Sequence, residues 1–186
     1  ADRQDGRVLD LAFGEERGRL YLAMRHVVGT DLHRFLRERG ALGLDELHPI
    51  ATQVAAALAA VHAAGLVHRD IKPANVLLAD EPGVGRHAYL TDFGLARIAE
   101  DVKLTRTGYV SGTPLYMAPE QALGAEPDPR SDLFSLGAVM YEMAAGQTPF
   151  TGGSALAILK QITEVKHKPL REVNPNAPAW LAEIID

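Results

Sequence analysis

Three short stretches of the 186-residue chain carry side chains whose types and spacing could do chemistry. The first, HRDIKPAN, contains Asp70, Lys72 and Asn75; the second, TDFG, contains Asp92; the third is APE at 118–120. Carboxylate and amide oxygens are the hard ligands that Mg²⁺ prefers. A lysine ammonium is a compact positive charge that can offset an anionic group. These residue types together favour a site that handles a cation and an anion.

One such motif alone carries little weight, because an isolated Asp-Phe-Gly is most often a turn. Three ordered motifs with compatible spacing rarely occur by accident. In this order they resemble the signature set of the protein-kinase superfamily. The resemblance extends over the whole chain and is closest in kind to bacterial eukaryotic-like Ser/Thr protein kinases.

The resemblance implies a role for each group in transfer of the γ-phosphoryl of ATP to Ser or Thr hydroxyls of proteins. Asp70 would orient the acceptor hydroxyl, and Lys72 would offset the charge of the transferred group. Asn75 and Asp92 would hold Mg²⁺, with Mn²⁺ as an acceptable substitute. Thr113, which precedes APE, would bond the catalytic Asp and Lys. Small-molecule phosphotransferases are a less favoured alternative, because they tend to lack the Arg-Asp-x-Lys arrangement.

The resemblance also places the nucleotide. Met24 would be the gatekeeper at the end of a strand behind the adenine, and His26 and Val27 would lie in the hinge. Asp31 could reach the ribose, and Leu77 could form the floor under the adenine. An apolar core position would explain Met24 and Leu77 equally well.

Regulation is expected around Arg69, which precedes the catalytic Asp. In kinases with this Arg, a phosphorylated residue of the activation loop pairs with it and orders the loop. Thr105 and Thr107 resemble the paired threonines of bacterial relatives, so we expect autophosphorylation there. The plainer alternative is a solvated Thr in an exposed loop.

Three further positions have expected structural roles. His68 is expected to be a core histidine, not a general base. Asp132, in SDLFSLG, is expected to hold the catalytic-loop backbone by hydrogen bonds, although a carboxylate near a helix N-terminus is also stabilised by the helix dipole. Glu120 pairs in the family with an Arg that would follow residue 186, so we expect it to be unpaired here.

The elements that position these groups follow from apolar periodicity. Strands are expected at 8–13 and 20–24, joined by a turn at 14–19, and in short pieces within 66–93, including 66–68, with a hairpin turn at DEPGVGRH. Helices are expected at 31–39, 45–64 with Pro49 in the first turn, 131–145 buried nearly all round, 154–163, and from about 178 with Ile184 facing inward. Residues 94–127 show no clear period and are expected to form a long loop region.

Composition narrows the classes further. Lys plus Arg number 19 and Asp plus Glu 24, so the net charge is −5, which argues against a nucleic-acid partner. The absence of cysteine removes disulfides, Cys-zinc sites and thiol catalysis. The apolar fraction of 47% is typical of a globular protein. The longest apolar run, 54–61, is far shorter than a membrane span needs.

The expected fold is α+β and protein-kinase-like, a mostly helical large lobe with short strands and a truncated small lobe. Residues 1–29 would be the small-lobe remnant, its last two strands and the hinge, and 30–186 the large lobe, truncated at its C-terminus. A glycine-rich loop, a V-A-I-K strand and the helix Glu that pairs with its Lys are missing from the sequence. We favour a piece of a normal kinase over a catalytically silent, kinase-derived scaffold. The resemblance further implies a cytoplasmic kinase domain acting on protein substrates, in a parent protein anchored in the plasma membrane, if at all, only through segments outside this chain. A homodimer is compatible with it.

Overall fold

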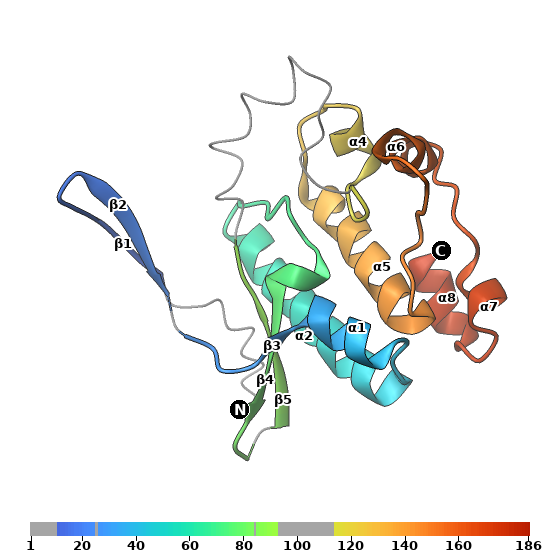
Figure 1. Ribbon diagram of the computed structural model, residues 1–186, viewed down its shortest axis with the longest axis horizontal. Coiled ribbons are helices and arrows are strands. Elements are labelled where there is room, and N and C mark those ends of the chain that lie inside the picture. The colour runs from blue at the N-terminus through green and yellow to red at the C-terminus, as the bar shows by residue number, and fades with distance from the viewer. Residues whose placement is uncertain (1–10, 25, 84, 93–113) are drawn as a thin grey trace.

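The computed structural model describes residues 11–24, 26–83, 85–92 and 114–186. The described elements are, in order, β1 (Leu11–Glu16), β2 (Arg19–Met24), β3 (Thr30–Asp31), α1 (Leu32–Arg39), α2 (Leu44–Ala63), η1 (Pro73–Asn75), β4 (Val76–Glu81), β5 (Gly85–Leu90), α4 (Pro119–Ala122), α5 (Pro129–Ala145), α6 (Ala155–Thr163), α7 (Leu170–Val173) and α8 (Ala179–Ile185). Helices dominate and the strands form small antiparallel sheets, so the expected α+β class is confirmed (Figure 1).

β1 and β2 form a hairpin that lies apart from the helices (Figure 1). Its turn consists of Arg17 and Gly18, both with positive φ, as a two-residue turn of the primed type requires. The first strand therefore ends at Glu16, three residues beyond its expected end, and the turn is shorter than the six residues expected at 14–19; residues 8–10, with which the strand was expected to begin, lie outside the described residues. The second strand was predicted within one residue.

A second sheet has the strand order β3–β4–β5. The start of β4, after Asn75, and the end of β5, before Asp92, lie at the candidate site. β4 pairs with β5 from Val76↔Leu90 to Glu81↔Gly85, and β3 adds the short pair Asp31↔Leu77. The hairpin predicted at DEPGVGRH is confirmed. Residues 66–68, expected to be extended, form no strand.

The helical core centres on α2 and α5, which pack against each other, while α2 also covers β5. The apolar stripe that predicts α2, Ile50, Val54, Leu58 and Val61, is buried, and so is Leu47. Pro49 lies in the second turn and not in the first as expected, because α2 begins at Leu44 and Pro49 is its sixth residue. At that position proline removes a hydrogen bond of the helix ladder instead of sitting harmlessly in the first turn.

α5 is the helix that the rest of the large unit surrounds. Leu136, Val139 and Met143 are buried, whereas Leu133 is 56% exposed, so its burial is nearly but not fully continuous. The helix begins after the N-cap Asp128 and ends at Gly146, whose φ of 70° is the left-handed conformation typical of a helix end.

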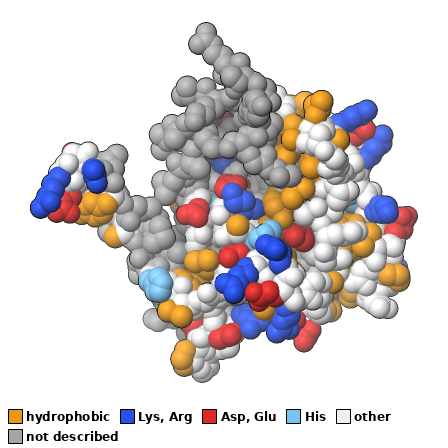
Figure 2. Space-filling model, in the orientation of Figure 1, with side chains coloured by type: hydrophobic (Ala, Val, Ile, Leu, Met, Phe, Trp, Pro, Cys, Tyr) orange, Lys and Arg blue, Asp and Glu red, His pale blue; other side chains and the backbone are white. Residues whose placement is uncertain are grey.

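The C-terminal part adds α6, α7 and α8 against α4 and α5. On α8, Leu181 and Ala182 are buried, but Ile184 is 66% exposed, so the expectation that it faces the core is wrong. Figure 2 shows apolar side chains beside α4 and mixed positive and negative side chains over α1. Among the described residues, none of the helices combines the length and apolarity that crossing a bilayer would require.

Candidate functional site

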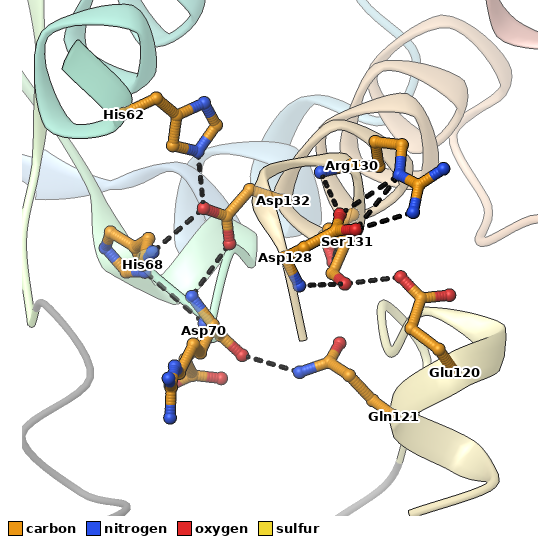
Figure 3. A network of polar contacts seen from close by, with 11 residues as sticks. His62, His68, Asp70, Glu120, Gln121, Asp128, Arg130, Ser131 and Asp132 are labelled. Carbon is orange, nitrogen blue, oxygen red and sulfur yellow. Dashed lines mark hydrogen bonds and ion pairs between the residues drawn. The ribbon is translucent and has the colours of Figure 1, made fainter. Parts of the chain in front are cut away.

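The segment between α2 and η1, residues 64–72, carries most of the candidate chemistry and is held by one carboxylate. Asp132, in the first turn of α5, is 1% exposed. Its Oδ2 accepts the backbone N–H of His68 (2.8 Å), and its Oδ1 accepts that of Arg69 (2.7 Å) (Figure 3). The predicted anchoring of this loop by Asp132 is therefore confirmed.

A third donor, which the sequence did not reveal, completes the environment of Asp132. Nε2 of His62, near the end of α2, lies 2.8 Å from Oδ2 of Asp132. The carboxylate thus joins α2, the loop and α5 (Figure 3). A buried carboxylate is stable only when hydrogen bonds replace its lost water, and these three contacts do so.

The backbone of Arg69 is in the left-handed region, with φ of 71°. For a residue other than glycine this conformation costs energy and persists only where neighbours enforce it. Here the N–H is held by Asp132, and the carbonyl accepts Nε2 of Gln121 (3.0 Å). The guanidinium donates from Nη2 to Oε1 of Glu126 (2.7 Å), an exposed partner.

His68 lies fully buried beneath this loop. Its Nδ1 accepts the backbone N–H of Asp70 (3.3 Å), so its Nε2 must carry the proton that is donated to the carbonyl of Thr91 (2.9 Å). Burial lowers the pKa of His68 below its usual value, against the opposing effect of the bond to Thr91. The expectation of a core histidine is confirmed, and its ring connects the Asp70 loop to the residue before Asp92.

Asp70, Lys72 and Asn75 form one cluster. Nζ of Lys72 lies 2.7 Å from Oδ2 of Asp70. Nδ2 of Asn75 donates to the same oxygen (3.0 Å) and to the backbone carbonyl of Asp70 (2.8 Å). η1, which Pro73 begins, brings the amide of Asn75 back toward the loop. The sequence-predicted trio therefore lies together, with Asn75 buried and the other two side chains half-exposed.

The hairpin register brings Asp92 to the same end of the sheet as Asn75. Thr91 N–H donates to the carbonyl of Asn75 (2.9 Å), extending the ladder beyond Val76↔Leu90. Asp92 is exposed and has a φ of 61°, a left-handed conformation that aspartate tolerates better than most residues.

These two residues fit a divalent cation. The NH₂ group of Asn75 is donated to Asp70, so its carbonyl oxygen is left to face another ligand. A carboxylate and an amide oxygen suit Mg²⁺, which usually takes few protein ligands together with phosphate oxygens. Within the described ranges there is no group of three His, Cys, Asp or Glu side chains placed to hold a metal.

The residues expected at the nucleotide lie around β2, β3 and β4. Met24 is the last residue of β2, and His26 beyond it is exposed. Val27 and Leu77 pack against the small buried cluster of Ala79 and Tyr89. Asp31, half-buried, is the N-cap of α1 and accepts the backbone N–H of Arg34 (2.8 Å). Asp31 and Leu77 are also direct partners in the β3–β4 ladder.

Glu120 differs from its expected state. The Oγ of Ser131 donates to Oε1 of Glu120, and the backbone N–H of Asp128 donates to Ser131 Oγ (3.2 Å) (Figure 3). The carboxylate of Glu120 is therefore not unpaired, because α4 is tied to the start of α5 through Ser131. Thr105, Thr107 and Thr113 lie outside the described residues.

Comparisons with known proteins complete the description of the site. The family model described as protein kinase domain matches residues 10–186. The chain is 46% identical over 161 residues to serine/threonine-protein kinase PkaA of Streptomyces coelicolor. The aligned region covers 87% of this chain and 29% of that protein. It is 40% identical over 169 residues to pkn3 of Myxococcus xanthus (88% and 31%) and 42% identical over 165 residues to PknL of Mycobacterium tuberculosis (89% and 40%), both with serine/threonine-protein kinase in their names. The chain thus spans less than half the length of these curated relatives.

Proposed function

Since this chain belongs to the protein kinase family, we propose that it transfers the γ-phosphoryl group of ATP to Ser or Thr hydroxyls of protein substrates. The family implies ATP and a divalent cation, and we propose Mg²⁺ for the cation, with Mn²⁺ as a substitute. When bound, the cation neutralises charge on the phosphates.

The observation that carries the proposal is the cluster of Asp70, Lys72 and Asn75 on a loop whose backbone is held from several sides. Phosphoryl transfer depends on positioning and charge neutralisation more than on covalent chemistry. A loop bonded through Asp132 and through the carbonyl of Arg69 supplies the positioning. The carboxylate, ammonium and amide supply the charges and ligands.

Each side chain has a free atom for its proposed role. Oδ2 of Asp70 accepts Lys72 and Asn75, while Oδ1 makes no hydrogen bond within the described part of the chain. Oδ1 is therefore the atom that would accept the hydrogen bond of the substrate hydroxyl and orient it. Lys72 is half-exposed and flexible, so it can turn from Asp70 toward the transferred group. Asn75 and Asp92 would hold the cation.

We also propose the nucleotide and regulatory roles of the remaining residues. Backbone groups at His26 and Val27 would meet the adenine beside Met24, with Leu77 below it and Asp31 near the ribose. Arg69 would receive a phosphorylated Thr105 or Thr107, and Thr113 would support selection of Ser and Thr. Because Glu126 already accepts one of the five N–H donors of the Arg69 guanidinium, a phosphate would compete with it there. A phosphate carries more charge and more acceptor oxygens than a carboxylate, so it would win this competition.

The proposal is tested with Asp70→Asn in the full-length protein. Phosphate transfer from labelled ATP to the protein itself and to a general protein substrate should fall about a hundredfold or more. Equilibrium binding of ATP with Mg²⁺ should be retained. The matched control is Asp80→Asn, because among the described residues Asp80 pairs only with Arg86, near the far end of the β4–β5 hairpin.

Wild-type transfer rates in Asp70→Asn would refute the assignment of Asp70. A wild-type protein that binds partners but transfers no phosphate would refute the kinase activity and leave a scaffold in its place.

A further inference from the structure

We propose that Gln121 is a positioning residue, which fixes the peptide group between Arg69 and Asp70 and thereby links the orientation of Asp70 to the order of α4. This inference rests on the proposed kinase function. Gln121 lies 51 positions beyond Asp70 in the chain, on α4, the helix that begins within the APE motif. Figure 3 shows its side chain extending from α4 toward the loop.

The argument begins with the peptide group that precedes Asp70. Its carbonyl, that of Arg69, accepts Nε2 of Gln121 at 3.0 Å. Its N–H, that of Asp70, donates to Nδ1 of His68 at 3.3 Å. Both polar ends of one peptide plane are therefore bonded to side chains, which determines the direction in which the chain enters Asp70.

This peptide group needs such support. Arg69 has the left-handed φ of 71°, a conformation that relaxes unless its surroundings enforce it. Asp132 holds the N–H side of Arg69, and Gln121 holds the carbonyl side. If the bond from Gln121 is lost, the peptide between Arg69 and Asp70 can rotate while Asp132 still retains its own contact.

Gln121 is itself fixed at its other end. Its Oε1 accepts the backbone N–H of Ala118 (3.0 Å), and Ala118 is fully buried at the start of α4. Because the oxygen faces an N–H and the nitrogen faces a carbonyl, the orientation of the amide is determined by its partners. Each polar atom of the Gln121 amide therefore has a backbone partner, one in α4 and one in the catalytic loop.

The consequence is a direct connection between two functional segments. Ala118 lies at the C-terminal end of the expected activation loop, residues 92–120, and Asp70 is the proposed catalytic carboxylate. A shift of α4 would reach the Arg69 carbonyl through a single side chain, without passing through the hydrophobic core. Gln121 would thus make the orientation of the peptide group before Asp70 depend on whether α4 is ordered.

The test uses two variants of the full-length protein. Gln121→Met keeps the side-chain length and removes both hydrogen bonds. Gln121→Glu keeps an acceptor for Ala118 and places a second acceptor against the Arg69 carbonyl. The control is Gln53→Met, because Gln53 similarly bridges backbone groups, the N–H of Ala88 (2.7 Å) and the carbonyl of Arg86 (3.5 Å), away from the loop.

We expect kcat to fall by about tenfold to a hundredfold in both Gln121 variants, because small misplacements of a reacting group have effects of this size. KM for ATP should change less than about twofold, since the proposed nucleotide contacts lie elsewhere. Gln53→Met should lose thermal stability and keep the wild-type kcat. A wild-type kcat in Gln121→Met, or an equal loss of kcat in Gln53→Met, would overturn the inference.

A second measurement does not depend on activity. Amide hydrogen exchange in the segment 66–72 should accelerate in Gln121→Met and remain at the wild-type rate in Gln53→Met. An unchanged exchange rate in Gln121→Met would overturn the inference even if kcat fell. Absence of phosphate transfer in the wild-type protein would refute the proposed function alone, because the exchange experiment would still judge the role of Gln121.

Discussion

The replacement Asp132→Asn tests how strongly one carboxylate holds the catalytic loop. The carboxylate accepts the N–H groups of His68 and Arg69 and lies within hydrogen-bonding distance of His62, all at 2.7–2.8 Å. An asparagine has a single acceptor oxygen. Turned toward His68 and His62, it would direct its own NH₂ group at the N–H of Arg69, so that donor would lose its partner.

The magnitude follows from these contacts. A hydrogen bond to a charged acceptor contributes about 1.5–3 kcal/mol, and the two bonds that asparagine can retain lose their charge assistance. We therefore expect the free energy of unfolding to fall by about 3 kcal/mol, since disruption of a buried charged network costs about this much. For a domain of this size that corresponds to a decrease in Tm of roughly 6–12 °C.

The assay combines thermal unfolding with steady-state kinetics. Because the unpaired donor belongs to the residue before Asp70, kcat should fall about tenfold or more while KM for ATP stays close to wild type. The control is Asp128→Asn at the N-cap of the same helix, where asparagine caps as well as aspartate. That variant should keep both Tm and kcat.

Two results would refute the reasoning. A Tm for Asp132→Asn within about 2 °C of wild type would mean that the three contacts contribute little to the folded state. A large loss of Tm with an unchanged kcat would mean that Asp70 is positioned without help from Asp132.

Three other predictions follow from single features. Because burial lowers the pKa of His68, the unfolded chain binds a proton in a pH range where the folded chain does not. Protonation of His68 should therefore leave the free energy of unfolding unchanged above about pH 6.5. Below that pH the free energy of unfolding should fall, by up to about 1.4 kcal/mol per pH unit, as the pH decreases toward the lowered pKa. Urea unfolding at pH 7.5, 6.5 and 5.5 measures this, and a flat profile would contradict it. Gly146→Ala should lower the free energy of unfolding by about 1–2 kcal/mol, because φ is 70° and the added Cβ would lie 2.9 Å from a backbone nitrogen. Gly137→Ala, in open space inside α5, should raise the free energy of unfolding by about 0.5–1 kcal/mol in the same denaturation experiment. Equal effects would be inconsistent with the left-handed helix end. Glu126→Gln should change stability by less than about 1 kcal/mol, since the exposed fraction of the Glu126 side chain is 78%, yet should increase the gain in kcat/KM on activation-loop phosphorylation, because the phosphate no longer competes for Arg69; an unchanged gain would rule out competition.

The long periodic elements could be predicted from the sequence, because their signals are local. The stripe from Ile50 to Val61 gave α2 within one residue at each end. α5 was predicted two residues too short, because the N-cap Asp128 and Pro129 were not recognised as its start. α7 was missed, and so was α4 within the stretch 94–127 expected to be a loop, since a four-residue helix contains too few positions for a period.

The site was predictable where the chemistry lies within motifs and was not where contacts span the chain. Asp70, Lys72 and Asn75 lie within six residues, and their proximity follows from η1. Gln121 and His62 bond partners 52 and 70 positions away, and no local pattern distinguishes them from an ordinary helix surface. Glu126 and Arg69 are also far apart in the sequence, so their ion pair exists only in the folded chain and no local pattern predicts it.

Strand pairing in the β3–β4–β5 sheet sets the distances between the groups of the proposed nucleotide site. Asp31 is paired with Leu77, Leu77 lies two residues after Asn75, and Asp92 follows the residue that pairs with Asn75. The separations of these groups are therefore counted in strand residues of about 3.3 Å each. One residue inserted between Asn75 and Leu77 would displace the proposed metal ligands from the ribose side by that length and turn alternate side chains to the opposite face. The same insertion after Glu81, at the far tip of the hairpin, would leave all of these separations unchanged. We therefore expect variation in hairpin length at that tip.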